Sequence, residues 1–183
     1  MTLVLALALV GAALWAVSAF NRLVRLRNQV RAGWSDIDVQ LMRRHDLIPN
    51  LVDAVRAYAS HEKNAFEQVT ALRTEAMTTR SPARLADIES QLEQHVGRLL
   101  VLKEAYPELK ASENFLQLQR DLVDVEDHLQ YARRFYTGAV RELNDGVQRF
   151  PDMLVANSLG FKQAEFFEAV NDARAAPSLE LSP

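Results

Sequence analysis

The sequence predicts an all-α protein in which an N-terminal transmembrane helix precedes an antiparallel bundle of long helices. Three observations predict this fold. The chain carries no charged side chain from Met1 to Asn21, and the rest of it repeats apolar residues at helical spacing. Only six glycines and six prolines occur among its 183 residues. That share is about half the usual one, which disfavours a turn-rich β-sandwich or barrel.

Residues 1–20 have the length and composition of a membrane span. Apart from Thr2, Gly11 and Ser18, every residue in this stretch is apolar. A helix of this length covers about 30 Å, which is the thickness of a bilayer's hydrocarbon core. We therefore expect residues 1–20 to anchor the chain in a membrane.

Arginines follow this stretch directly, and no lysine or arginine precedes it. By the positive-inside rule, the C-terminal side lies in the cytoplasm and the N-terminus outside. Because Asp36 is the first acidic residue, no carboxylate dilutes this basic collar, and we expect its arginines to contact lipid headgroups at the membrane interface. The alternative is a cleaved signal peptide cut after Ala19, although such peptides normally begin with basic residues. The four interface residues are Arg22, Arg25, Arg27 and Arg31.

The first amphipathic stripe after the anchor contains one charged residue and one proline. Arg44 interrupts the stripe, and Pro49 follows within the same pattern. Either Asp46 caps a new helix with Pro49 in its first turn, or one long helix kinks at Pro49. The stripe keeps its phase from Leu41 to Ile48, which favours the kink. The apolar members are Trp34, Ile37, Leu41, Ile48, Leu51, Val55, Tyr58, Phe66, Val69 and Ala76.

Two further helices are predicted downstream. Ser81 is a candidate N-cap before Pro82 at the first helical position, and the helix closes at Tyr106-Pro107. Its stripe is Leu85, Ile88, Leu92, Val96, Leu99 and Leu102. Ser112 is a candidate cap for a long helix over 115–150, which Pro151 ends. That helix has eleven apolar positions spaced by threes and fours, namely Phe115, Leu118, Leu122, Val125, Leu129, Ala132, Tyr136, Ala139, Leu143, Val147 and Phe150.

The connections between these helices are short, so neighbouring helices should run antiparallel. After Pro151, a segment with Phe161, Phe166 and Phe167 is expected to fold against an end or side of the bundle. Residues 172–183 lose the helical periodicity. The predicted organisation is therefore an anchor over 1–20, a bundle domain over 21–171 and a loose tail over 172–183.

The sequence contains no recognisable catalytic or metal-binding motif. The absence of cysteine excludes disulfides, a thiol nucleophile and iron–sulfur clusters. No glutamate has a histidine three residues later, which a di-iron bundle requires. Asp124 and His128, with Asp121 one turn earlier, are the nearest approach to a metal site, and a solvated acidic face explains them more simply. We expect no enzymatic activity, no cofactor and no small-molecule substrate.

Charge also limits the partners. The net charge is −3, so bulk attraction to nucleic acid is not expected. Arg43 and Arg44 lie about 35 Å beyond the end of the span at residue 20 along a straight helix, too far for lipid contact, and an ordinary solvated helix face is the simplest interpretation of both. Together with Asp46 and Pro49, they are the candidate residues for binding a protein partner.

Several segments resemble the LemA family. The stretch from Asn21 to Glu62, which contains IDVQLMRRHDLIPNLV, is similar to the N-terminal signature of that family. The resemblance continues in YPELKASENFLQLQRDL, ARRFYTGAV, RFP and GFKQAEFFE, and so covers roughly 21–168. Departures are small, with Phe20 and His45 where tyrosine is usual and Thr137 where asparagine is usual.

The resemblance implies a bacterial, single-pass membrane protein with its N-terminus outside and an antiparallel helical bundle. It implies no established enzymatic activity, and a related branch is associated with magnetosome membrane formation. We therefore expect a non-catalytic scaffold or adaptor at the cytoplasmic face of the inner membrane, which binds an unidentified protein or itself. The alternatives are a membrane-organising or lipid-binding protein and, more remotely, a metal-dependent enzyme acting through Asp124 and His128.

Overall fold

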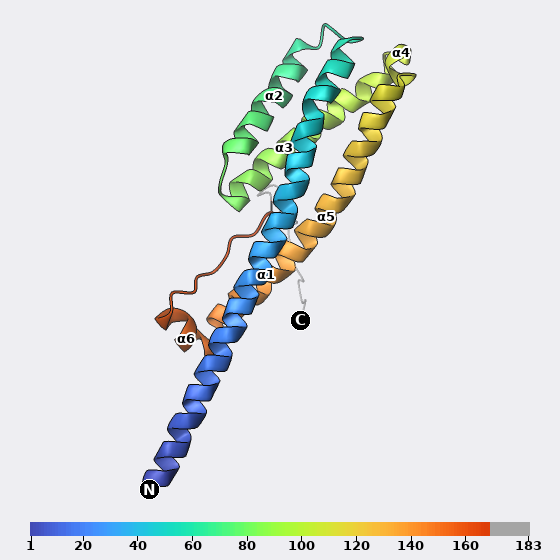
Figure 1. Ribbon diagram of the computed structural model, residues 1–183. Coiled ribbons are helices and arrows are strands. Elements are labelled where there is room, and N and C mark those ends of the chain that lie inside the picture. The colour runs from blue at the N-terminus through green and yellow to red at the C-terminus, as the bar shows by residue number, and fades with distance from the viewer. Residues whose placement is uncertain (169–183) are drawn as a thin grey trace, which may run out of the picture. The chain divides into compact units, whose positions relative to one another are not determined.

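The computed structural model describes residues 1–168, and the described part contains helices and connecting segments without a strand. The all-α fold predicted from sequence is thereby confirmed. The predicted tail at 172–183 and the end of the bundle domain at 171 lie outside the described residues. The helices are α1 (Thr2–Arg56), α2 (Lys63–Thr78), α3 (Pro82–Val101), η1 (Leu102–Glu104), α4 (Pro107–Lys110), α5 (Glu113–Gln148) and α6 (Asp152–Ser158) (Figure 1).

The chain forms two compact units, and both long helices contribute to each of them. The first unit contains residues 1–39 and 128–166. The second contains residues 40–127 together with Phe167 and Glu168. Each unit therefore has its own part of α1 and its own part of α5.

The second unit is a bundle of antiparallel helices around an apolar core. The last part of α1, α2, α3 and the first part of α5 lie side by side (Figure 1), and all four contribute side chains to this core. The predicted N-caps are confirmed, because Ser81 Oγ accepts from the Arg84 N–H at 3.5 Å and Ser112 Oγ from the Phe115 N–H at 3.4 Å. The core residues are Ile48, Leu51, Val52, Val55, Ala59, Phe66, Val69, Leu92, Val96, Leu99, Leu109, Phe115 and Leu122.

The first unit contains the N-terminal part of α1, the C-terminal part of α5, α6 and the segment after α6. Leu23, Leu143, Val147, Ala156 and Phe161 form its buried cluster. Every member of the predicted α5 stripe is buried except Phe150, which lies beyond the helix end and is 73% exposed. The expectation that the segment around Phe161 folds against the bundle is met in this unit.

Two side chains of α5 hold the backbone of that last segment. Asn144 donates through Nδ2 to the Ala164 carbonyl at 3.0 Å and accepts from the Ala164 N–H at 2.8 Å. The Tyr136 hydroxyl donates to the Glu165 carbonyl at 2.8 Å. These bonds replace the backbone pairing that an irregular segment cannot supply for itself.

Helix α1 continues without interruption through Pro49 to Arg56. The alternative in which Asp46 caps a new helix is therefore wrong. In an unbroken helix, the N–H of residue 49 would donate to the carbonyl of His45, and proline has no N–H to give. Arg73 of α2 takes its place, donating through Nε to the His45 carbonyl at 2.7 Å.

Candidate functional site

The N-terminal part of α1 exposes its apolar side chains. Leu3, Leu7 and Leu14 are 73%, 66% and 68% exposed. Only 6% of the most apolar 18-residue window of α1 is buried within the protein. A core helix of a soluble protein would bury such a surface, so the exposed face is typical of a helix that meets lipid.

The arginines that follow the apolar stretch differ in their surroundings. Arg25 and Arg31 are exposed, and the Arg27 guanidinium lies 5.1 Å from the centre of the Phe161 ring. Arg22 forms an ion pair with Asp152, which is only 2% exposed. The expectation of a basic collar without a neighbouring carboxylate is therefore wrong at Arg22. Asp152 follows Arg22 by 130 positions in the sequence, and only folding brings the two together.

Arg44 is buried in the second unit among carboxylates. It is 4% exposed, and its Nη1 atom lies 3.5 Å from Glu89 Oε2 and 3.6 Å from Glu126 Oε2. Its Nη2 atom lies 3.8 Å from Glu93 Oε2. The interpretation of Arg44 as part of a solvated face is therefore wrong, because the guanidinium points into the bundle and not toward water.

Glu89 is the centre of this cluster. It has no exposed surface, and its second oxygen, Oε1, lies 2.6 Å from His45 Nε2. One carboxylate thus faces both Arg44 and His45, which are neighbours on α1. A charge this deeply buried is tolerated only when it is paired, so each group depends on the others.

The cluster ties together all four long helical segments of the second unit. Arg44 and His45 come from α1, Glu89 and Glu93 from α3, and Glu126 from α5. Arg73 adds α2 through the His45 carbonyl. The segment around Pro49 is thus a junction of side-chain and backbone bonds, which gives a structural reason for the pattern RRHDLIP.

The other predicted partner-binding residues lie outside this junction. Arg43, Asp46 and Pro49 are exposed. Arg43 Nη2 lies 3.6 Å from Asp124 Oδ2, with about half of each side chain exposed. Asp124, one of the two residues of the metal hypothesis, therefore pairs with an arginine. Among residues 1–168, no group of three histidine, aspartate or glutamate side chains is placed to hold a metal ion.

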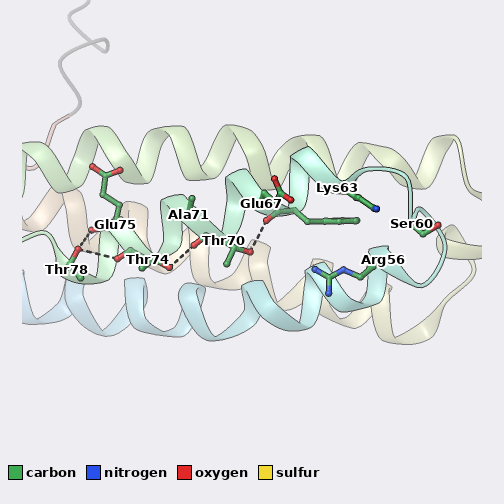
Figure 2. Close-up of a pocket in the computed structure, with 10 residues that line it drawn as sticks. Arg56, Ser60, Lys63, Glu67, Thr70, Ala71, Thr74, Glu75 and Thr78 are labelled. Carbon is green, nitrogen blue, oxygen red and sulfur yellow. Dashed lines mark hydrogen bonds between the residues drawn. The ribbon is translucent and has the colours of Figure 1, made fainter.

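A surface pocket of about 880 Å³ runs along α2 from Lys63 to Thr78, and Arg56 and Ser60 line it at one end (Figure 2). The Thr70 hydroxyl donates to the Phe66 carbonyl at 2.8 Å and that of Thr74 to the Thr70 carbonyl at 2.9 Å. These hydroxyls are thus engaged with their own helix. Arg56 covers the Phe66 ring, with its guanidinium 5.3 Å from the ring centre. The pocket presents methyl groups and separate charges, not an arranged acid, base or nucleophile.

Comparison with known proteins agrees with the motifs. The sequence profile of the LemA family matches residues 33–181. The chain belongs to the LemA family. Two of its relatives are magnetosome protein MamQ 2 of Paramagnetospirillum magneticum, 23% identical over 175 residues, and magnetosome protein MamQ of Magnetospirillum gryphiswaldense, 22% identical over 174 residues. The match covers 81% of this chain in both cases, and the chain spans 64% of the length of each of these relatives.

A third relative carries the family name itself. Protein LemA of Metamycoplasma hominis is 26% identical over 153 residues, and the match covers 81% of this chain and 68% of that protein. Neither its name nor those of the magnetosome proteins states a reaction.

The sequence contained one signal for the buried cluster. Glu89 lies four residues after Leu85 and three before Leu92, so it occupies the same buried face as the α3 stripe. Arg44 likewise interrupts the α1 stripe. Two opposite charges at core positions of different helices predict a buried pair. No such signal marks the bonds made by Arg73, Asn144 and Asp152. Arg73 and Asn144 bond to backbone groups, which apolar spacing does not distinguish, and Asp152 pairs with an arginine that is distant in the sequence.

Proposed function

We propose that this LemA-family chain is a membrane-anchored, non-catalytic scaffold or adaptor, with its helical bundle at the cytoplasmic face of the bacterial inner membrane. The observation that carries the proposal is the exposed apolar surface of α1, which continues without a break into the folded bundle. Helix α1 is unbroken from Thr2 to Arg56, so the anchor and the residues that follow it belong to one helix.

The packing around the candidate signal-peptidase site after Ala19 supports retention of the anchor. Ala19 is 4% exposed, and the Phe20 ring lies edge-on to Phe161 with 5.9 Å between ring centres. Both sides of the candidate cleavage point are therefore held by the first unit. A protease that cut after Ala19 would have to act on chain that is helical and packed.

The orientation rests on the arginines. Arg25, Arg27 and Arg31 have exposed side chains and follow the apolar stretch of α1 closely. Lysine and arginine beside a span favour the cytoplasmic side during insertion. We therefore propose an outside N-terminus and a cytoplasmic C-terminal domain.

The scaffold role rests on which residues near Pro49 lie at the surface. Arg44 and Glu89 neutralise each other inside the bundle, whereas Arg43, Asp46 and Pro49 face outward next to them. We propose that these three exposed residues contact a protein partner or a second copy, and that Arg44 positions them from within.

In-cell photo-crosslinking tests this role. A photoreactive residue at Arg43 should give one reproducible cross-linked product, whereas the same residue at exposed Gln91 of α3 should give none. Equal products at both positions, or none at either, would contradict a partner surface next to Pro49.

Membrane organisation or lipid binding is a second candidate. It is favoured by Leu154 and Leu159, which are 52% and 58% exposed in the first unit. Native mass spectrometry of the full chain tests it, because a lipid-binding protein should retain phosphatidylglycerol after detergent removal. Release of every lipid under conditions that keep the chain folded would count against this candidate.

A further inference from the structure

An apolar groove lies in the first unit, where α1 and α6 meet. Its volume is about 610 Å³, which is within the range of small-molecule sites. Val17 and Phe20 of α1 form one wall, and Leu154 and Val155 of α6 with the following Leu159 form the other. The side chains of Val17, Leu154 and Leu159 are each more than half exposed.

This groove is continuous with the apolar surface of the anchor. Val17 and Phe20 lie five and two residues before the first arginine, Arg22, so the surface that meets lipid runs directly into the groove wall. A span that begins at Thr2 reaches Phe20 after about 27 Å, close to the thickness of the hydrocarbon core. The groove therefore opens at the depth where acyl chains end and headgroups begin.

The charges beyond the groove match a phospholipid. Phe161 contacts two side chains of α1. Its ring lies edge-on to the Phe20 ring, and the Arg27 guanidinium lies over it, 5.1 Å from the ring centre. Arg27 follows Phe20 by seven residues, or about 10 Å along the helix. An acyl chain in the groove would thus bring its phosphate toward an exposed cation.

We propose that this groove holds one acyl chain of a phospholipid from the leaflet at the C-terminal end of the span, with the lipid phosphate near Arg27. The groove is less suited to a soluble protein, because one wall of the groove is the anchor helix, which lies in hydrocarbon. The proposal rests on the proposed membrane anchor, and it adds a lipid site that fixes α6 against the bilayer.

Site-specific quenching tests the proposal, because the chain has no cysteine and accepts a single one for labelling. The variants are Leu154→Cys in the groove, Asn157→Cys on a face of α6 outside the groove, and Leu9→Cys in the span. Each carries a fluorophore in vesicles of phosphatidylglycerol and phosphatidylcholine. Lipids brominated on their acyl chains quench from the bilayer, and iodide quenches from water.

We expect brominated lipid to quench the Leu154 label several-fold more strongly than the Asn157 label, and iodide to do the reverse. Adding Arg27→Gln should weaken the brominated-lipid quenching at Leu154, and Arg134→Gln should leave it unchanged. Iodide access to Leu154 equal to that at Asn157, or a Leu154 label shielded from both quenchers, would overturn the proposal. In those cases, a Leu9 label quenched only by brominated lipid would leave the anchor intact, whereas iodide access to Leu9 would overturn the anchor as well.

Discussion

The two units bury their polar groups in different ways. The second unit encloses a charged cluster, in which Arg44 meets Glu89 and Glu126 and His45 meets Glu89. The first unit uses neutral side chains, Asn144 and Tyr136, to bond the backbone of its last segment, and its buried Asp152 pairs with Arg22, which is partly exposed to water. Each arrangement pairs groups that water cannot reach, but the penalties for disturbing them differ.

This difference teaches where each unit is vulnerable. A buried ion pair contributes little net stability compared with a hydrophobic pair, yet removing one partner leaves a buried charge unpaired. The second unit should therefore be most sensitive to loss of a single charge. The first unit should be sensitive instead to steric changes and to loss of individual hydrogen bonds.

Removing the central carboxylate should have the largest effect. Glu89→Ala leaves Arg44 buried without its closest carboxylate, and we expect the free energy of unfolding to fall by about 3–5 kcal/mol. Urea unfolding of the full chain in a mild detergent measures this loss. Glu93→Ala is the matched control, because Glu93 is half-exposed and 3.8 Å from Arg44, and should cost less than about 1 kcal/mol.

Equal losses for the two glutamate variants would contradict a buried cluster centred on Glu89. A double variant, Arg44→Met with Glu89→Leu, tests whether the loss comes from an unpaired buried charge. It removes both charges at once and should recover much of the stability that Glu89→Ala loses.

A steric change in the first unit should come next. A Cβ atom at Gly33 would lie 3.2 Å from the Tyr136 Cα and 3.0 Å from the Phe135 ring. Gly33→Ala should therefore push α1 and α5 apart locally and destabilise the protein by about 1–3 kcal/mol. Fluorescence of Trp34, whose ring lies 5.5 Å from that of Tyr136, reports the change.

Gly138→Ala provides the matched control on α5. A Cβ atom there meets nothing within 4 Å, so the variant should gain about 0.5–1 kcal/mol from helix propensity alone. If both glycine variants stabilise the protein, close approach of the two helices at Gly33 is not what holds this unit together.

The bond between Arg73 and the His45 carbonyl should show an intermediate effect. Arg73→Met leaves that carbonyl without its donor and should cost about 1–2 kcal/mol. In a Pro49→Ala background, the new N–H of residue 49 can donate to the same carbonyl, so the loss should be smaller. A double-mutant cycle measures the coupling, and strictly additive effects would show that Arg73 does not compensate for the proline.

The smallest effect should come from Tyr136→Phe, which removes one hydrogen bond to Glu165 and should cost about 0.5–1.5 kcal/mol. Burial, and to a lesser degree the charge of Glu165, raises the pKa of the Tyr136 phenol above its ordinary value of 10.0. The unfolded chain therefore releases this proton at a lower pH than the folded chain does. The associated stability is present below about pH 10 and is lost as the pH rises through the folded pKa.

Comparison of alkaline unfolding curves tests the tyrosine prediction. The parent protein should lose stability more steeply above pH 10 than Tyr136→Phe does. Parallel curves for the two proteins would mean that the phenol titrates alike in the folded and unfolded chains.

The sequence could predict the helices because their apolar spacing, caps and proline positions are local signals. It also predicted the anchor, whose composition is independent of tertiary contacts. It could not decide the path of the chain at Pro49, because the continuous helix depends on a donor from Arg73 in another helix. The burial of Arg44 depends likewise on Glu89, which lies 45 residues away.

The candidate site was predicted only in part. The interface role of the collar arginines stays a prediction, and the structure adds that Arg22 pairs with the distant Asp152. The groove beside Phe20 could not be predicted, since the sequence does not tell which face of the anchor α6 covers. A feature that depends on composition alone, such as the apolar anchor, can be predicted from sequence. A feature that depends on the pairing of distant residues, such as Arg44 with Glu89, requires the structure.

The central claim is an intact N-terminal anchor that holds the bundle at the cytoplasmic face. Labelling of Glu67→Cys, an exposed position in the second unit, with a membrane-impermeant maleimide tests it most directly in spheroplasts before and after lysis. We predict no labelling before lysis, full labelling afterwards, and recovery of the labelled chain at its full mass in the membrane fraction. Labelling of intact spheroplasts, or a labelled chain that is soluble and begins at Phe20, would contradict the claim.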